Sequence, residues 1–176
     1  MSAVPDVRGP GRTSAALRAC LIRKALADCR QRAAAARMLG LTVTDVLALQ
    51  HLAWAGVLTP RALSARLHLT SGGTSTLVQR LERHGLVTGE PHPEDRRSTL
   101  LRLSSTGEQR ATRAYAPLVR DVDAVIDALE ADDRAVVEAF LDRVAVVTDA
   151  CADELARSLQ GKQVPVEAVP HAGLWA

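Results

Sequence analysis

Aromatic residues are scarce in this chain of 176 residues, at 2%, although hydrophobic residues make up 47%. The interior must therefore be built mainly from leucine, valine and alanine, a composition that favours interlocking helices over a β-sandwich. We expect a fold that is all or mainly α-helical. The length suits one compact domain, or two small lobes that share a core.

Long apolar runs and a cysteine framework are also missing. No stretch of about 18 consecutive apolar residues occurs, and the N-terminus is polar, so we expect a soluble, cytoplasmic protein with no membrane partner. Three cysteines at wide spacings, Cys20, Cys29 and Cys151, form neither a disulfide framework nor a zinc signature. The five histidines have no compact spacing with cysteine or carboxylate residues. No metal or other cofactor is predicted.

Motifs of catalysis are absent as well. The chain has no phosphate-binding glycine loop and no nucleophile motif, and Gly72-Gly73 lies at a helix start rather than after a strand. We therefore predict no catalytic residues and no enzymatic activity.

Charge is distributed unevenly, although the formal net charge is only +2. Residues 8–37 carry eight basic residues against one acid, and residues 60–102 carry seven arginines against four acids. Residues 103–160 reverse the balance, with twelve acids against six arginines. A nucleic-acid face, if there is one, belongs to the first two blocks.

Helix-start and helix-stop residues divide the first half of the chain into four predicted helices. Thr42 and Asp45 form a capping-box pattern, and Thr59 precedes a proline that suits the first helical position. The predicted helices cover 13–39, 42–55, 60–67 and 71–84, with glycines at positions 40, 56 and 85 as stops.

The second half begins with two predicted strands, 86–90 and 98–103, around a loop whose prolines make a continuous helix implausible. Two long amphipathic helices, 106–129 and 133–159, are predicted to follow. Residues 161–176 are expected to form a flexible C-terminal tail.

Helices 60–67 and 71–84, joined by a tight turn, are typical of a helix-turn-helix, in which the second helix enters the major groove of DNA. The two strands that follow would add a wing. In this region the chain resembles the MarR family of winged helix-turn-helix transcriptional regulators. The resemblance rests on the order and spacing of Leu41-Thr42, Leu63-Ser64-Ala65-Arg66-Leu67, Leu77-Val78-Gln79-Arg80-Leu81-Glu82, Gly85-Leu86-Val87, Pro93-Glu94-Asp95-Arg96-Arg97 and Leu101-Arg102-Leu103.

The resemblance implies a mainly α fold with a two- or three-stranded β wing. Residues 41–105 would form the DNA-binding domain, and helices 13–39 and 106–159 would form a dimerisation region. The chain departs from the family pattern where Ser104-Ser105-Thr106-Gly107 replaces a more usual Leu-Thr-x-x-Gly, and where Thr88-Gly89 stands in place of an arginine.

The resemblance also assigns DNA-contacting residues. At the wing tip, Arg97 would enter the minor groove, where negative potential is focused, while Asp95 would orient it by a charge-assisted hydrogen bond. Thr70 is expected to cap the recognition helix. The predicted DNA-binding residues are Ser71, Ser75, Thr76, Gln79 and Arg80 on this helix and Asp95, Arg96 and Arg97 in the wing.

By the same resemblance, we expect a homodimer that binds a palindromic double-stranded operator and acts as a repressor. A small aromatic or phenolic effector would bind between the dimer region and the winged lobe and change the spacing of the recognition helices.

Two alternatives stay open. Some relatives sense oxidants through a cysteine in the first helix, and Cys20 and Cys29 lie there near arginines, a setting typical of reactive cysteines. The same fold can also serve as a protein-interaction module that does not bind DNA.

Overall fold

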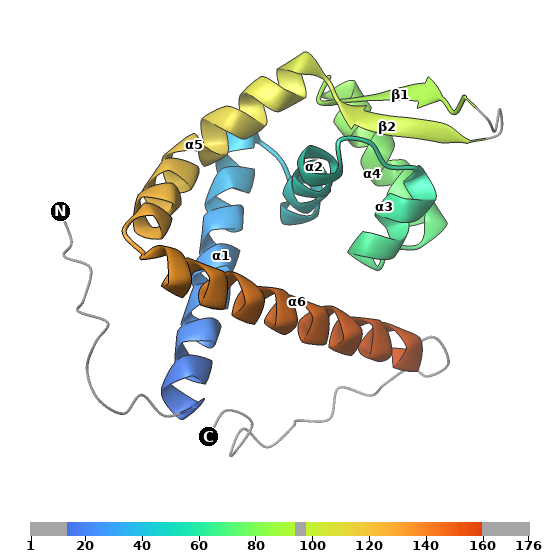
Figure 1. Ribbon diagram of the computed structural model, residues 1–176. Helices are drawn as coiled ribbons and strands as arrows, with labels where there is room; N and C mark the ends of the chain where they lie inside the picture. Colours follow the sequence, from blue (N-terminus) through green and yellow to red (C-terminus); the bar gives the residue numbers. More distant parts are fainter. Residues whose placement is uncertain (1–13, 94–97, 160–176) are drawn as a thin grey trace.

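A computed structural model describes residues 14–93 and 98–159 of the chain. It is mainly helical, with one small antiparallel sheet (Figure 1). The N-terminal elements are α1 (Ser14–Leu39), α2 (Val43–Ala55), α3 (Pro60–Leu67) and α4 (Ser71–Arg83). Strands β1 (Val87–Pro91) and β2 (Thr99–Leu103) come next, followed by the long helices α5 (Ser105–Asp127) and α6 (Ala131–Leu159). The mainly α fold with a β wing is confirmed.

Threonine side chains cap the N-termini of three helices at the positions that the sequence predicts. Thr42, Thr59 and Thr70 each have extended backbone and accept a hydrogen bond from a backbone N–H of the first turn of α2, α3 and α4. Asp45 completes the capping box of α2, because its carboxylate accepts from the backbone N–H of Thr42 at 3.0 Å. Gly56 ends α2 with a positive φ of 72°.

The start of α5 corrects one sequence expectation. The helix begins at Ser105 rather than at residue 106, and Ser104 caps it by accepting from the backbone N–H of Gly107. Ser104 therefore takes the role of the threonine in the usual Leu-Thr-x-x-Gly pattern. Gly107 packs against the backbone just before β1, where an added Cβ would collide with the carbonyl oxygen of Leu86.

Strands β1 and β2 pair from Val87 with Leu103 to Pro91 with Thr99. An isolated bridge between Leu58 and Leu101 adds a third, minimal partner to this sheet. The wing is therefore two-stranded, and it is joined to the segment that connects α2 and α3.

Two groups of buried apolar residues hold the described part of the chain together, and α2 contributes to both. The first core lies among α2, α3, α4 and the wing, and the second joins α1 to α2. Arg110 of α5 also donates to the carbonyl oxygen of Leu39 at the end of α1, at 3.3 Å. The first core contains Ala48, Leu49, Leu52, Leu58, Leu63, Leu77, Val78, Leu81, Leu86, Val87 and Leu101; the second contains Ala35, Ala36, Leu39 and Val46.

In contrast, α6 buries none of the side chains that the structure describes for it. In Figure 1 it extends from the end of α5 beneath the domain formed by α2, α3 and α4. Valine, leucine, isoleucine and phenylalanine residues are exposed along it and along α5. These residues, which we call the apolar face of α5 and α6, are Leu118, Val119, Val122, Val125, Ile126, Val136, Val137, Phe140, Leu141, Val146, Val147 and Leu155.

Among the described helices, no single one is long and apolar enough to cross a membrane, and one bent pair, α1 with α2, meets that length and composition only when the two are joined across a 99° bend.

Replacing Gly107 with alanine should destabilise the protein. The new Cβ would collide with backbone that cannot rotate away, and overpacking of this kind costs about 1–3 kcal/mol. Urea unfolding followed by circular dichroism measures the free energy of unfolding. Gly72→Ala is the matched control, since nothing lies within 4 Å of its added Cβ. Equal unfolding midpoints for the two variants would show that α5 does not pack on Leu86 as described.

Candidate nucleic-acid interface

The turn between α3 and α4 is held by local hydrogen bonds. His68 adopts the left-handed conformation at a φ of 50°, and the backbone N–H of Leu69 donates to the carbonyl oxygen of Ser64 at 3.1 Å. The hydroxyl of Ser64 returns a hydrogen bond of 2.7 Å to the carbonyl oxygen of Leu69. This reciprocal pair fixes the angle at which α4 leaves α3, so the two helices form a helix-turn-helix.

One side of α4 is buried and the other faces solvent. Thr74, Leu77, Val78 and Leu81 are buried at the side that meets the first core. The predicted contact residues Ser71, Ser75, Thr76 and Gln79 are all exposed.

Two hydroxyls on the exposed side are already oriented by the helix itself. Ser75 donates to the carbonyl oxygen of Ser71, and Thr76 donates to that of Gly72, each at 3.0 Å. Their oxygen lone pairs remain able to accept hydrogen bonds from outside the helix. Beside them, Gly72 has open space around it, so the backbone of this turn can approach a ligand closely.

Arg80 differs from the other predicted contact residues, because its guanidinium is engaged inside the protein. Nη2 lies 2.6 Å from Oδ1 of Asp45, and Nε lies 3.1 Å from Oδ1 and 3.0 Å from Oδ2. Asp45 is fully buried, and Arg80 keeps 32% of its side-chain surface exposed. A direct base contact by Arg80 therefore stays a prediction, and its established partner is a carboxylate on α2.

The ion pair changes the acidity of both groups. Burial alone would raise the pKa of Asp45, but hydrogen bonds from Arg80 and Thr42, together with the positive charge of Arg80, outweigh burial and lower it. The hydrogen bond to Asp45 raises the pKa of Arg80 above its ordinary value. The pair is consequently charged throughout the physiological pH range.

The predicted wing-tip residues Asp95, Arg96 and Arg97 lie outside the described residues, so their contacts stay predictions. The strands that carry the wing are placed next to α4. An added Cβ at Gly89 would lie 2.9 Å from a methyl group of Thr99 and 3.2 Å from a carboxylate oxygen of Glu82 on α4. A side chain at position 89 would therefore have to displace the ends of the Thr99 and Glu82 side chains.

An open cleft of about 1210 Å³ lies between α1, α2 and α5. Its lining is mostly apolar, with a few polar groups, which is typical of small-molecule sites. Within it, Nε of Arg32 donates to the side-chain oxygen of Gln50 at 3.3 Å. Trp54, also in the lining, is 90% exposed. Sequence reasoning placed an effector between the dimer region and the winged lobe without naming any of these residues.

Tyr115 of α5 is also part of the lining of the cleft. Among the described residues its hydroxyl is buried without a hydrogen bond of good geometry. Burial raises the pKa of Tyr115, against the opposing effects of Arg32 and Gln31. The phenol is therefore neutral at physiological pH.

Residues 39–98 match the model of the MarR family. YcgE, an uncharacterized HTH-type transcriptional regulator of Bacillus subtilis (strain 168), is 34% identical over 85 residues, which are 48% of this chain and 55% of YcgE. The similarity to the MarR family therefore covers the segment from the end of α1 to the wing. The region matched in YcgE spans about half the length of that curated relative.

Solved structures with low sequence identity share the fold of this protein. A mutant of MepR, from a multidrug-resistant S. aureus clinical isolate, has a TM-score of 0.62 at 17% identity and covers 74% of this chain and 96% of its own. NadR in complex with 4-hydroxyphenylacetate has a TM-score of 0.59 at 21% identity and covers 78% and 98%. The winged-helix fold predicted from the motifs is thereby confirmed.

The three cysteines of this protein are free thiols in the described residues. Cys20 is half-buried and accepts a hydrogen bond of 3.4 Å from Nη2 of Arg23, while Cys29 is exposed. Oxidant sensing by Cys20 or Cys29 stays a prediction. Within residues 14–93 and 98–159, no group of three or more histidine, cysteine or carboxylate side chains could hold a metal ion.

Asp45→Asn should lower the free energy of unfolding by about 2 kcal/mol at pH 7, because charge-assisted hydrogen bonds to a buried carboxylate are lost. The folded-state pKa of Asp45 is depressed, so its stabilisation is complete above the unfolded-state pKa and is lost as the pH falls through the folded-state pKa. The stability gap between the native protein and Asp45→Asn should therefore shrink as the pH falls below about 4.

Urea unfolding at several pH values measures this gap. Asp28→Asn is the control, since Asp28 forms only an exposed pair with Lys24 on α1 and should change stability by less than about 0.5 kcal/mol. A gap that stays constant between about pH 7 and pH 3 would contradict the assignment of the depressed pKa to Asp45.

Proposed function

We propose that this protein is a DNA-binding transcriptional regulator that reads an operator through α4 and the wing. The observation that carries the proposal is the exposed side of α4, where Ser75, Thr76 and Gln79 stand on a helix fixed by the turn before it. Small hydroxyls suit phosphate or base contacts, and glutamine suits adenine. Arg97 in the wing would add a minor-groove contact.

We further propose that the regulator acts as a homodimer. The apolar face of α5 and α6 is long and exposed in the isolated chain, and exposed apolar surface of this extent is typical of an interface. A second copy is the occupant that fits best, because two winged helices can read paired half-sites about one helical turn apart.

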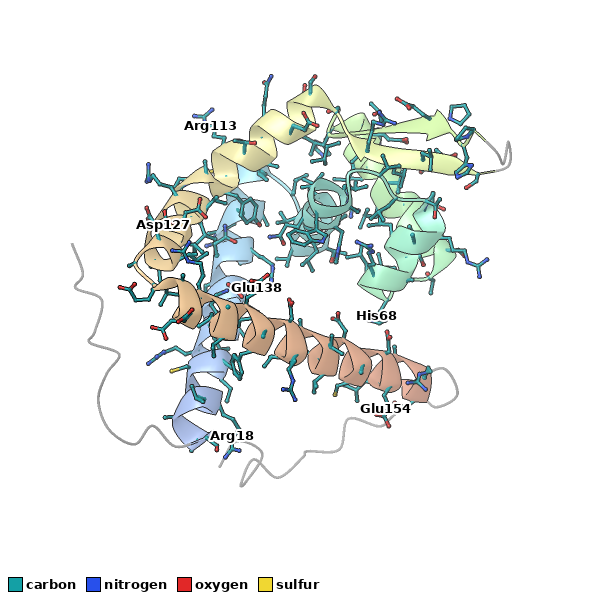
Figure 2. All side chains as sticks on the ribbon, viewed as in Figure 1. Arg18, His68, Arg113, Asp127, Glu138 and Glu154 are labelled. Carbon is teal, nitrogen blue, oxygen red and sulfur yellow. The ribbon has the colours of Figure 1, made fainter. Side chains whose placement is uncertain are left out.

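Charge supports this arrangement. Figure 2 shows Asp127 at the end of α5 and Glu138 and Glu154 along α6, whereas Arg18 lies near the start of α1. The acids on α5 and α6 would repel DNA from this end of the molecule.

The cleft is the proposed effector site, and repression relieved by the effector is the proposed mode of regulation. NadR holds 4-hydroxyphenylacetate in its solved structure. In this chain the cleft offers apolar walls, the Arg32 guanidinium for an anionic group and the aromatic side chain of Tyr115. A ligand that favours an unsuitable spacing of the two recognition helices would reduce operator affinity by linkage.

The DNA proposal is tested on a duplex selected from a random pool by the native protein. Arg97→Ala should weaken binding about tenfold and reduce the slope of log affinity against log salt by about 1. Gln79→Ala should weaken binding by a similar factor and relax the preference at one base pair. Arg143→Ala on α6 is the matched control and should bind normally, since Arg143 is an exposed arginine that belongs to neither α4 nor the wing.

Sedimentation equilibrium on the same samples reports whether the DNA-binding species is a dimer. If the native protein binds no duplex even at low salt, the DNA-binding proposal is wrong, and the interaction-module alternative is favoured.

The effector proposal is tested by fluorescence of Trp54, in a Trp175→Phe background that leaves one tryptophan in the chain. Titration with 4-hydroxyphenylacetate should quench Trp54 and release the selected duplex. The uncharged amide of the same compound should bind about tenfold more weakly, as should the acid to Arg32→Ala, because both lose the charge-assisted contact. Unchanged fluorescence and unchanged DNA binding across a panel of aromatic acids would count against this site.

A further inference from the structure

A single buried carboxylate serves two helices at once. Oδ2 of Asp45 accepts from the backbone N–H of Thr42 at 3.0 Å and from its hydroxyl at 2.8 Å, and thus closes the N-terminus of α2. The same carboxylate accepts Nε and Nη2 of Arg80, which lies 35 positions later on α4. The oxygen lone pairs are therefore shared between the start of α2 and the recognition helix.

The helix that carries Asp45 is well anchored. Val46, the next residue, packs in the second core, and Ala48, Leu49 and Leu52 pack in the first. Because both cores hold α2, Asp45 is a fixed point to which another helix can be tied.

Apolar packing alone does not fix the rotation of α4 about its own axis well, whereas an ion pair can. Leu77, Val78 and Leu81 hold α4 against the first core, but apolar contacts are not directional and allow small rotations of a helix about its own axis. A guanidinium fork on a buried carboxylate is directional, and it fixes both the distance and the angle between its partners. Arg80 directly follows Gln79, so this constraint acts next to the exposed side of α4.

We propose that Asp45 and Arg80 form a positioning pair, which sets the rotation of α4 and so determines which base edges its exposed side chains reach. The inference rests on the proposed function. Sequence discrimination depends on the pair, whereas non-specific attraction to phosphates does not. Arg80 acts here through Ser75, Thr76 and Gln79 and need not touch a base itself.

The test compares Asp45→Asn, Arg80→Gln and the double variant Asp45→Asn/Arg80→Gln on two duplexes. One is the duplex selected by the native protein, with each of its base pairs also varied singly; the other is a scrambled duplex of the same length. The double variant keeps the net charge of the native protein and leaves no unpaired buried charge, so it stays informative if a single variant fails to fold. Circular dichroism and urea unfolding establish that each protein is folded.

The positioning role predicts that each folded variant binds the selected duplex about tenfold more weakly and loses preference at several base pairs. The double variant should show the same loss as each single variant, with scrambled-duplex affinity within about twofold of the native protein. If Arg80→Gln loses preference at one base pair while Asp45→Asn keeps them all, Arg80 reads a base directly and the proposal is wrong.

An unchanged preference pattern in the folded double variant would equally overturn it, and would leave the pair with a stabilising role alone. Failure of the proposed function is distinguishable from either result, because it appears in the native protein as the absence of any selected duplex.

Discussion

The burial of α2 between two cores is the constraint on which the rest of the structure depends. Its apolar residues divide between the core shared with α3, α4 and the wing and the smaller core shared with α1. The same helix lines the cleft and carries the carboxylate that holds Arg80. The proposed DNA-reading helix, the proposed effector cleft and the attachment of the long helices therefore all depend on one element of thirteen residues.

Local chemistry explains why much of the fold could be predicted from the sequence. The caps at Thr42, Thr59 and Thr70 depend on a hydroxyl and a backbone N–H only three residues away, so the pattern is visible in the chain itself. The wing followed from the paired strands and the motif order. The start of α5 was placed one residue too late, because Ser104 was not recognised as the cap.

The parts that could not be predicted depend on contacts distant in sequence. The 3.6-residue period puts Arg80 at the edge of the exposed side of α4, and nothing in the local sequence indicates a buried partner on α2. The lining of the cleft could not be predicted either, since Arg32, Gln50 and Tyr115 come together from three helices. A threonine with an acid three residues later did indicate that Asp45 caps a helix. Its ion pair with Arg80 could be recognised only from the folded structure.

The division of α2 between two cores also bears on how the native protein opens. Opening free energies differ among segments of a folded protein, and amide hydrogen exchange reports them segment by segment. The amides of α6 are covered by little besides their own helix, because its described side chains are not buried. Those of α2 cannot open without breaking both cores. In the isolated chain, we therefore expect exchange to be slowest in the middle of α2, so that the helix at the centre of the proposed function is also the last to lose its hydrogen bonds.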